Sequence, residues 1–163
     1  MAIGPDHQIA LACVNTNAEI IDDNGNKVAL LTGDGGGDEV WFNPGDGHYF
    51  FGIAGTGQLG VADAGPPPSV DATAPSAIGA HSVAADPFRN QVYVPISAHA
   101  PGSTVCSSTA DVFGDKGNNA LGCIAIYTSP NDDRGCIAEG MAVVATNDAG
   151  DPQFRRGRCH DHD

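Results

Sequence analysis

Short apolar runs alternate with polar, glycine-rich turns through most of this chain of 163 residues. Clusters of Gly, Pro, Asn and Asp separate runs that are rich in β-branched and aromatic residues. This punctuation is typical of many short strands, because a helix needs a longer unbroken apolar period. The pattern predicts strands at residues 8–14, 18–22, 27–31, 39–42, 48–53, 58–64, 69–73, 82–85, 91–96 and 123–127. The chain is therefore predicted to be all-β.

One kind of segment, a proline-containing turn followed by a strand, occurs three times. The prolines concerned lie 39 and 43 residues apart, at Pro5, Pro44 and Pro87. A period near 40 with several strands per unit is the signature of β-propeller blades. The blades are expected at residues 1–32, 38–74 and 81–130, with a long insertion in the third. Because the first unit shows three strands, we expect its innermost strand to be missing, which leaves about two and a half four-stranded blades.

The third copy of this segment also resembles a known repeat. It reads Asp86-Pro87, then Asn90-Gln91-Val92-Tyr93-Val94-Pro95, and His81-Ser82-Val83-Ala84 precedes it. This sequence resembles the YVTN/NHL-type repeat, which is shared by secreted bacterial propellers and by gluconolactonase-like hydrolases. The resemblance covers residues 4–130 and leaves a C-terminal tail, 131–163, unmatched. It implies a partial β-propeller and relatives that are mostly secreted or periplasmic.

An incomplete propeller has an uncovered apolar sheet face on either side, and such faces favour association. We therefore expect a homo-oligomer in which two or three protomers complete one ring by head-to-tail contacts. Residues 139–146 have the length and composition of an innermost strand. We expect this segment of the tail to fill the missing position in the first blade of a neighbouring protomer.

The start of each innermost strand faces the central channel of a propeller, where ligands and metals are held. In the repeat register, Asp38 corresponds to His81, and Glu39 is the next residue along. Glu139, at the start of the tail strand that fills the first blade of a neighbour, would be the third member of the set. These side chains could bind a divalent cation, calcium or zinc, or Asp38 and His81 could divide acid and base roles in catalysis. The alternatives are that the carboxylates are turn residues with local hydrogen bonds and that His81 is a buried imidazole bonded to a carbonyl.

The resemblance implies an activity as well. Lactonases and organophosphatases of the propeller type hold a catalytic metal, usually calcium, at this place, and the equivalent ligands would be Asp38, Glu39 and His81. Their asparagine ligands have no clear match here. We therefore expect a metal-assisted hydrolase of esters, lactones or organophosphates, with a small-molecule ligand in the channel. The alternative is a non-catalytic propeller that binds a ligand or protein, or a truncated fragment of one.

Composition limits the remaining possibilities. The net charge of −13 argues against a nucleic-acid partner, and no apolar stretch is long enough to span a membrane. Cys106 and Cys123 flank one polar loop and are predicted to form a disulfide, which suits an exported protein. The first residues lack the basic and apolar regions of a signal peptide, so we expect either a cytoplasmic chain or, preferably, one that has lost its N-terminal part. We interpret the glycine-rich run 32–37 as a tight turn and His48 as structural.

Overall fold

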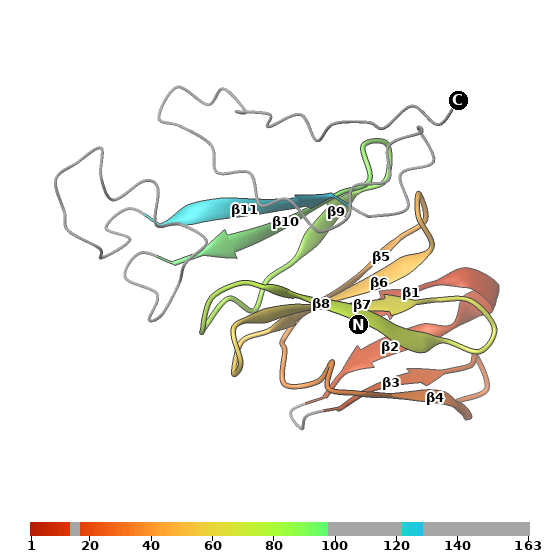
Figure 1. Ribbon diagram of the computed structural model, residues 1–163. Coiled ribbons are helices and arrows are strands. Elements are labelled where there is room, and N and C mark those ends of the chain that lie inside the picture. The colour runs from red at the N-terminus through yellow and green to blue at the C-terminus, as the bar shows by residue number, and fades with distance from the viewer. Residues whose placement is uncertain (14–16, 98–121, 129–163) are drawn as a thin grey trace, which may run out of the picture.

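The computed structural model describes residues 1–13, 17–97 and 122–128, which form three antiparallel sheets, none of them closed on itself (Figure 1). The first sheet has the order β1-β2-β3-β4, with β1 (Ala2–Ile3), β2 (Ile9–Ala12), β3 (Asn17–Ile21) and β4 (Lys27–Thr32). The second has the order β5-β6-β7-β8, with β5 (Val40–Asn43), β6 (His48–Ile53), β7 (Gln58–Asp63) and β8 (Ser69–Pro75). The third consists of β9 (Ala84–Asp86), β10 (Gln91–Ile96) and β11 (Cys123–Thr128), with β10 in the centre.

The all-β prediction is confirmed, and each predicted strand has a counterpart within a few residues. The predicted absence of an innermost strand in the first sheet is wrong. Ala2 pairs with Ala10 and Ile3 with Ile9, so β1 completes four strands. Two residues are too short a run to be recognised from periodicity. The position that we assigned to residues 139–146 of a neighbour is therefore occupied by β1, and those residues lie outside the described part of the chain.

The three proline turns share one backbone feature, a positive φ close to the following strand. It is 75° at Gly47, directly before β6, 48° at Asn90, directly before β10, and 60° at His7, two residues before β2. Gly and Asn tolerate this left-handed region better than other residues. A left-handed residue thus recurs near the three positions where the sequence repeats.

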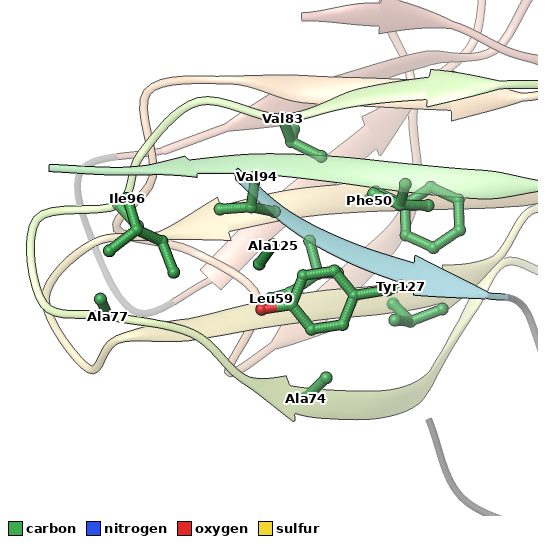
Figure 2. Packing of buried hydrophobic residues seen from close by; sticks show 12 residues of the cluster. Phe50, Leu59, Ala74, Ala77, Val83, Val94, Ile96, Ala125 and Tyr127 are labelled. Carbon is green, nitrogen blue, oxygen red and sulfur yellow. The ribbon is translucent and has the colours of Figure 1, made fainter. Parts of the chain in front are cut away.

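Among the described residues, the buried hydrophobic side chains form two clusters, one on each face of the second sheet. All six residues of β6 are buried. Tyr49 and Phe51 pack with residues of the first sheet, whereas Phe50 packs with residues of the third. Figure 2 shows the second of these clusters, in which Phe50 and Leu59 lie with Val94 and Tyr127. The second sheet is therefore covered on both faces, and it holds the other two sheets together.

The strands that begin each sheet lie next to one another. β5 is beside both β1 and β9, and the last strands of the first two sheets, β4 and β8, are also in contact. Figure 1 shows the third sheet above the second and the first sheet below it. The linkers that enter β5 and β9 are consequently brought together at one side of the stack. In the described part of the chain, no helix is long and apolar enough to cross a membrane.

Candidate functional site

Asp38 and His81 occupy equivalent places in two successive linkers. The first linker joins β4 to β5, and the second joins β8 to β9. Each contains a glycine with positive φ two residues before the polar side chain, Gly36 at 82° and Gly79 at 84°. Because β5 and β9 lie side by side, the structure brings the two side chains together: His81 Nδ1 is 3.5 Å from Asp38 Oδ2. The side chains are 78% exposed for Asp38 and 53% exposed for His81.

Two glycines allow this close approach. A Cβ atom added to Gly52 in β6 would lie 2.6 Å from the backbone oxygen of His81. One added to Gly37 would collide with the backbone oxygen of Gly52. The amide of Gly52 also donates a hydrogen bond of 3.3 Å to the backbone oxygen of Glu39. The centre of the second sheet therefore supports both linkers directly, and a side chain at either glycine would push the linkers apart.

Glu39 has a different role from its neighbour. Its Oε2 accepts a hydrogen bond of 3.1 Å from the backbone amide of Val83, which precedes β9. This bond joins the second sheet to the third. Within residues 1–13, 17–97 and 122–128, no three His, Cys, Asp or Glu side chains are grouped so that they could hold a metal ion. Glu139 lies outside these ranges, so the predicted metal set of Asp38, Glu39, His81 and Glu139 stays a prediction.

The geometry of Asp38 and His81 suits proton transfer. A carboxylate beside Nδ1 favours the imidazole tautomer that carries its proton there, which leaves Nε2 with a lone pair. A histidine held in this way can take a proton from a water molecule and return it to a leaving group. The pair is thus a candidate general base, and Glu39 together with the two glycines positions it.

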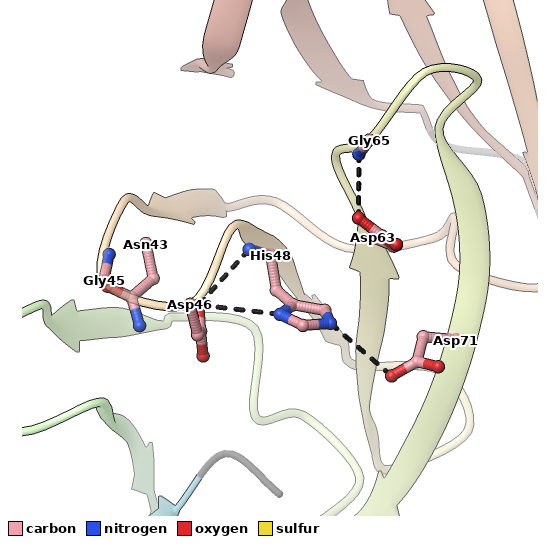
Figure 3. A network of polar contacts seen from close by, with 7 residues as sticks. All are labelled: Asn43, Gly45, Asp46, His48, Asp63, Gly65 and Asp71. Atoms are coloured by element: carbon pink, nitrogen blue, oxygen red, sulfur yellow. Dashed lines mark hydrogen bonds and ion pairs between the residues drawn. The ribbon is translucent and has the colours of Figure 1, made fainter. Parts of the chain in front are cut away.

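A second histidine is buried between two carboxylates (Figure 3). His48 is 4% exposed, its Nδ1 lies 3.6 Å from Asp46 Oδ1, and its Nε2 lies 3.6 Å from Asp71 Oδ2. The pKa of His48 is raised, chiefly by its interaction with Asp46. The charge of Asp71 also raises this pKa, whereas burial of the ring lowers it. Asp46 is in the turn before β6 and Asp71 is on β8. The three groups tie a turn to the last strand of the second sheet.

Asp34 is a buried carboxylate that the sequence interpretation missed, because it lies in a run interpreted only as a tight turn. It is fully buried, and neither carboxylate oxygen has a hydrogen-bond partner within the described residues. Its Oδ1 lies 2.6 Å from where a Cβ of Gly60 would be, so the missing side chain of β7 makes the room for it. Burial raises the pKa of Asp34 to about 6. The sequence did contain one signal for this contact, Gly60 inside a predicted strand, because a glycine within a strand often marks the close approach of another group.

The described cysteines differ in their chemistry. Cys123 is disulfide-bonded, as the predicted Cys106–Cys123 bridge requires, and Cys106 lies outside the described residues. Cys13 is a free, partly buried thiol directly after β2. Neither cysteine is part of the site at Asp38 and His81. No protein-family model and no curated protein matches this chain.

Proposed function

We propose that the three sheets are successive blades of a partial β-propeller. In a propeller, each blade runs outward from an innermost strand, and the innermost strands surround a central channel. The side-by-side arrangement of β1, β5 and β9, each the first strand of its sheet, supports this interpretation. The recurring turn and linker conformations support it as well. On this interpretation the linkers before β5 and β9 lie at the mouth of the channel.

We further propose that the protein hydrolyses esters, lactones or organophosphates at this mouth. The observation that carries the proposal is the distance of 3.5 Å between His81 Nδ1 and Asp38 Oδ2. His81 accepts a proton at Nε2 from a water molecule, whose oxygen attacks the carbonyl or phosphoryl centre. The same nitrogen then returns the proton to the departing alkoxide, so that the products are an acid and an alcohol. Asp38 holds the ring in the orientation that these proton transfers need.

A divalent cation would supply charge stabilisation for the attacked oxygen. Calcium takes six to eight oxygen ligands and zinc about four ligands of mixed type. The described residues offer Asp38 and His81, and one oxygen of Glu39 is already bonded to the amide of Val83. This set is smaller than either metal requires, so every step is assigned to the histidine and aspartate alone.

The experiment is a rate measurement on a panel of aryl esters, lactones and phosphotriesters. Replacing His81 by Gln should lower kcat about 10²–10⁴-fold, the usual contribution of a general base. The matched control is His7→Gln, because His7 is also an exposed histidine beside a carboxylate, 3.9 Å from Asp23. Equal rates in His81→Gln and wild type would refute the proposal. Repeating the assay with added calcium, zinc or a chelator tests the metal separately.

A second candidate is a non-catalytic propeller that binds a ligand. It is favoured by the exposure of both side chains, since catalytic pairs are commonly shielded from water. If this alternative holds, the panel shows no turnover, whereas a ligand that is retained by the wild-type protein is lost on Asp38→Ala. Turnover that depends on His81 would exclude it.

A further inference from the structure

The two central strands of the second sheet, β6 and β7, present residues to both neighbouring sheets. We call the face toward the preceding sheet the leading face and the face toward the following sheet the trailing face. In β6, Tyr49 and Phe51 are on the leading face, and Phe50 is on the trailing face. In β7, Leu59 and Val61 are also on the trailing face. Both faces of this sheet are therefore built for packing against another sheet of the same kind.

The first sheet has the same two faces, and its leading face has no described sheet against it. Ala10 of β2 packs against the second sheet, so its neighbours Ile9 and Leu11 lie on the opposite, leading face. Cross-strand pairing places three more apolar residues on this leading face. Ile3 and Ile21 both pair with Ile9, and Leu30 pairs with Glu19, which in turn pairs with Leu11. Leu30 is 50% exposed and Ile3 is 68% exposed. Residues of the opposite face, such as Ile20 and Leu31, are buried against the second sheet.

The third sheet shows the reverse situation. Val92 and Val94 of β10, and Ala125 and Tyr127 of β11, form its leading face and pack on the second sheet. The residues between them make the trailing face, where Tyr93 pairs with Ile126 and Pro95 pairs with Ile124. Ile124 is 51% exposed. In the repeat register, Ile124 and Ile126 are the equivalents of Leu59 and Val61, which are core residues in the second sheet.

We propose that two copies of this chain associate head to tail, with the trailing face of the third sheet of each copy packed on the leading face of the first sheet of the other. The proposal rests on the assignment of the sheets as blades under the proposed function. The chain already makes this contact twice, between its first and second sheets and between its second and third. A second copy supplies a surface of the same kind as those that already pack against each other within the described part of the chain.

The charges on the leading face and the number of sheets in a closed ring both agree with a second copy as the partner. The charged residues of the leading face that the register identifies are Glu19 and its neighbour Lys27, which form an ion pair of 2.6 Å. The contact would thus bury no unpaired charge from that pair. Propellers have about four to eight blades. Two copies of the three described sheets make six, whereas three copies would make nine, so the ring closes with two.

The test uses one lysine substitution on each face, at half-exposed positions where the chain can fold without the contact. Ile124→Lys alters the trailing face and Leu30→Lys the leading face. Each variant alone should associate at least about tenfold more weakly than wild type, since a lysine would be buried without a partner. Phe88→Lys is the matched control, because Phe88 is 91% exposed in a turn and belongs to neither face. It should associate like wild type.

Mixing the two variants gives the decisive result. A copy with Ile124→Lys keeps an intact leading face, and a copy with Leu30→Lys keeps an intact trailing face. The mixture should therefore form a heterodimer through one contact, detected by pulling down a tagged variant with an untagged one. The serine variants of the same two residues repeat the measurement without an added charge. A wild-type chain that stays monomeric, or single variants that dimerise as well as wild type, would overturn the proposal. Neither outcome depends on hydrolysis, so the association and the activity fail or succeed separately.

Discussion

The buried carboxylate of Asp34 makes stability depend on pH in a direction opposite to that of most acids. Its oxygens have no hydrogen-bond partner within the described residues, and burial raises its pKa from 3.8 to about 6. The folded protein therefore prefers the protonated acid. Asp34→Asn keeps the shape of the side chain and removes its charge at every pH, so the comparison with wild type isolates the cost of ionisation.

The magnitude follows from the two pKa values. Below pH 3.8 the acid is protonated in both the folded and unfolded states, and the substitution changes no ionisation energy. As pH rises from 3.8 to about 6, the unfolded chain loses the proton and the folded chain keeps it, which costs stability. The difference amounts to about 3 kcal/mol, at about 1.4 kcal/mol per pH unit. Above about pH 6 this destabilisation is constant.

The assay is urea unfolding of wild type and Asp34→Asn over this pH range, followed by circular dichroism. The variant should gain stability relative to wild type as pH rises, to about 3 kcal/mol above pH 6. Asp6→Asn, at an exposed position in the first proline turn, is the control for the change of acid to amide itself. A stability difference between Asp34→Asn and wild type that is constant with pH, or that falls as pH rises, would refute the reasoning.

Three further predictions concern the second sheet and the disulfide. His48 has a raised pKa, chiefly because of Asp46, so its stabilising contribution is complete below pH 6.5 and is lost as pH rises through the folded pKa. His48→Gln should abolish this pH dependence in urea midpoints, and an unchanged dependence would contradict the assignment. Gly60→Ala should lower the free energy of unfolding by about 1–3 kcal/mol, because the added methyl group crowds Asp34. In a double-mutant cycle, this loss should be smaller when Asp34→Ala has already removed the carboxylate, and an equal loss would contradict the crowding. Peptide mapping without reductant should show Cys123 joined to Cys106, with about 3 kcal/mol of stability lost on reduction; another partner for Cys123 would contradict the prediction.

The strands and their turns could be predicted because both depend on local chemistry. Runs such as His48–Ile53 are rich in aromatic and apolar residues, and the turns that separate the runs require glycine, asparagine or proline. The proximity of Asp38 and His81 could also be predicted, because equivalent positions in successive repeats are neighbours once the repeats stack.

Other features depend on contacts that no local pattern encodes. The strand Ala2–Ile3 is defined by its partner Ile9–Ala12 and is too short to show alternation. The burial of Asp34 depends on the missing side chain of Gly60, which is 26 residues away in the sequence. The hydrogen bond that the amide of Val83 donates to Glu39 gives a structural role to a residue that its repeat position had marked as a metal ligand. In each case the feature depends on a contact with a residue from a different segment of the chain, so the local pattern could not predict it.

The mass of the untagged wild-type protein in solution, measured by sedimentation equilibrium over a range of concentrations, tests the central claim most directly. If the exposed faces of the first and third sheets join copies of the chain, a species of twice the chain mass of 16.6 kDa should form and grow with concentration. A folded protein that remains at 16.6 kDa at every concentration would contradict it.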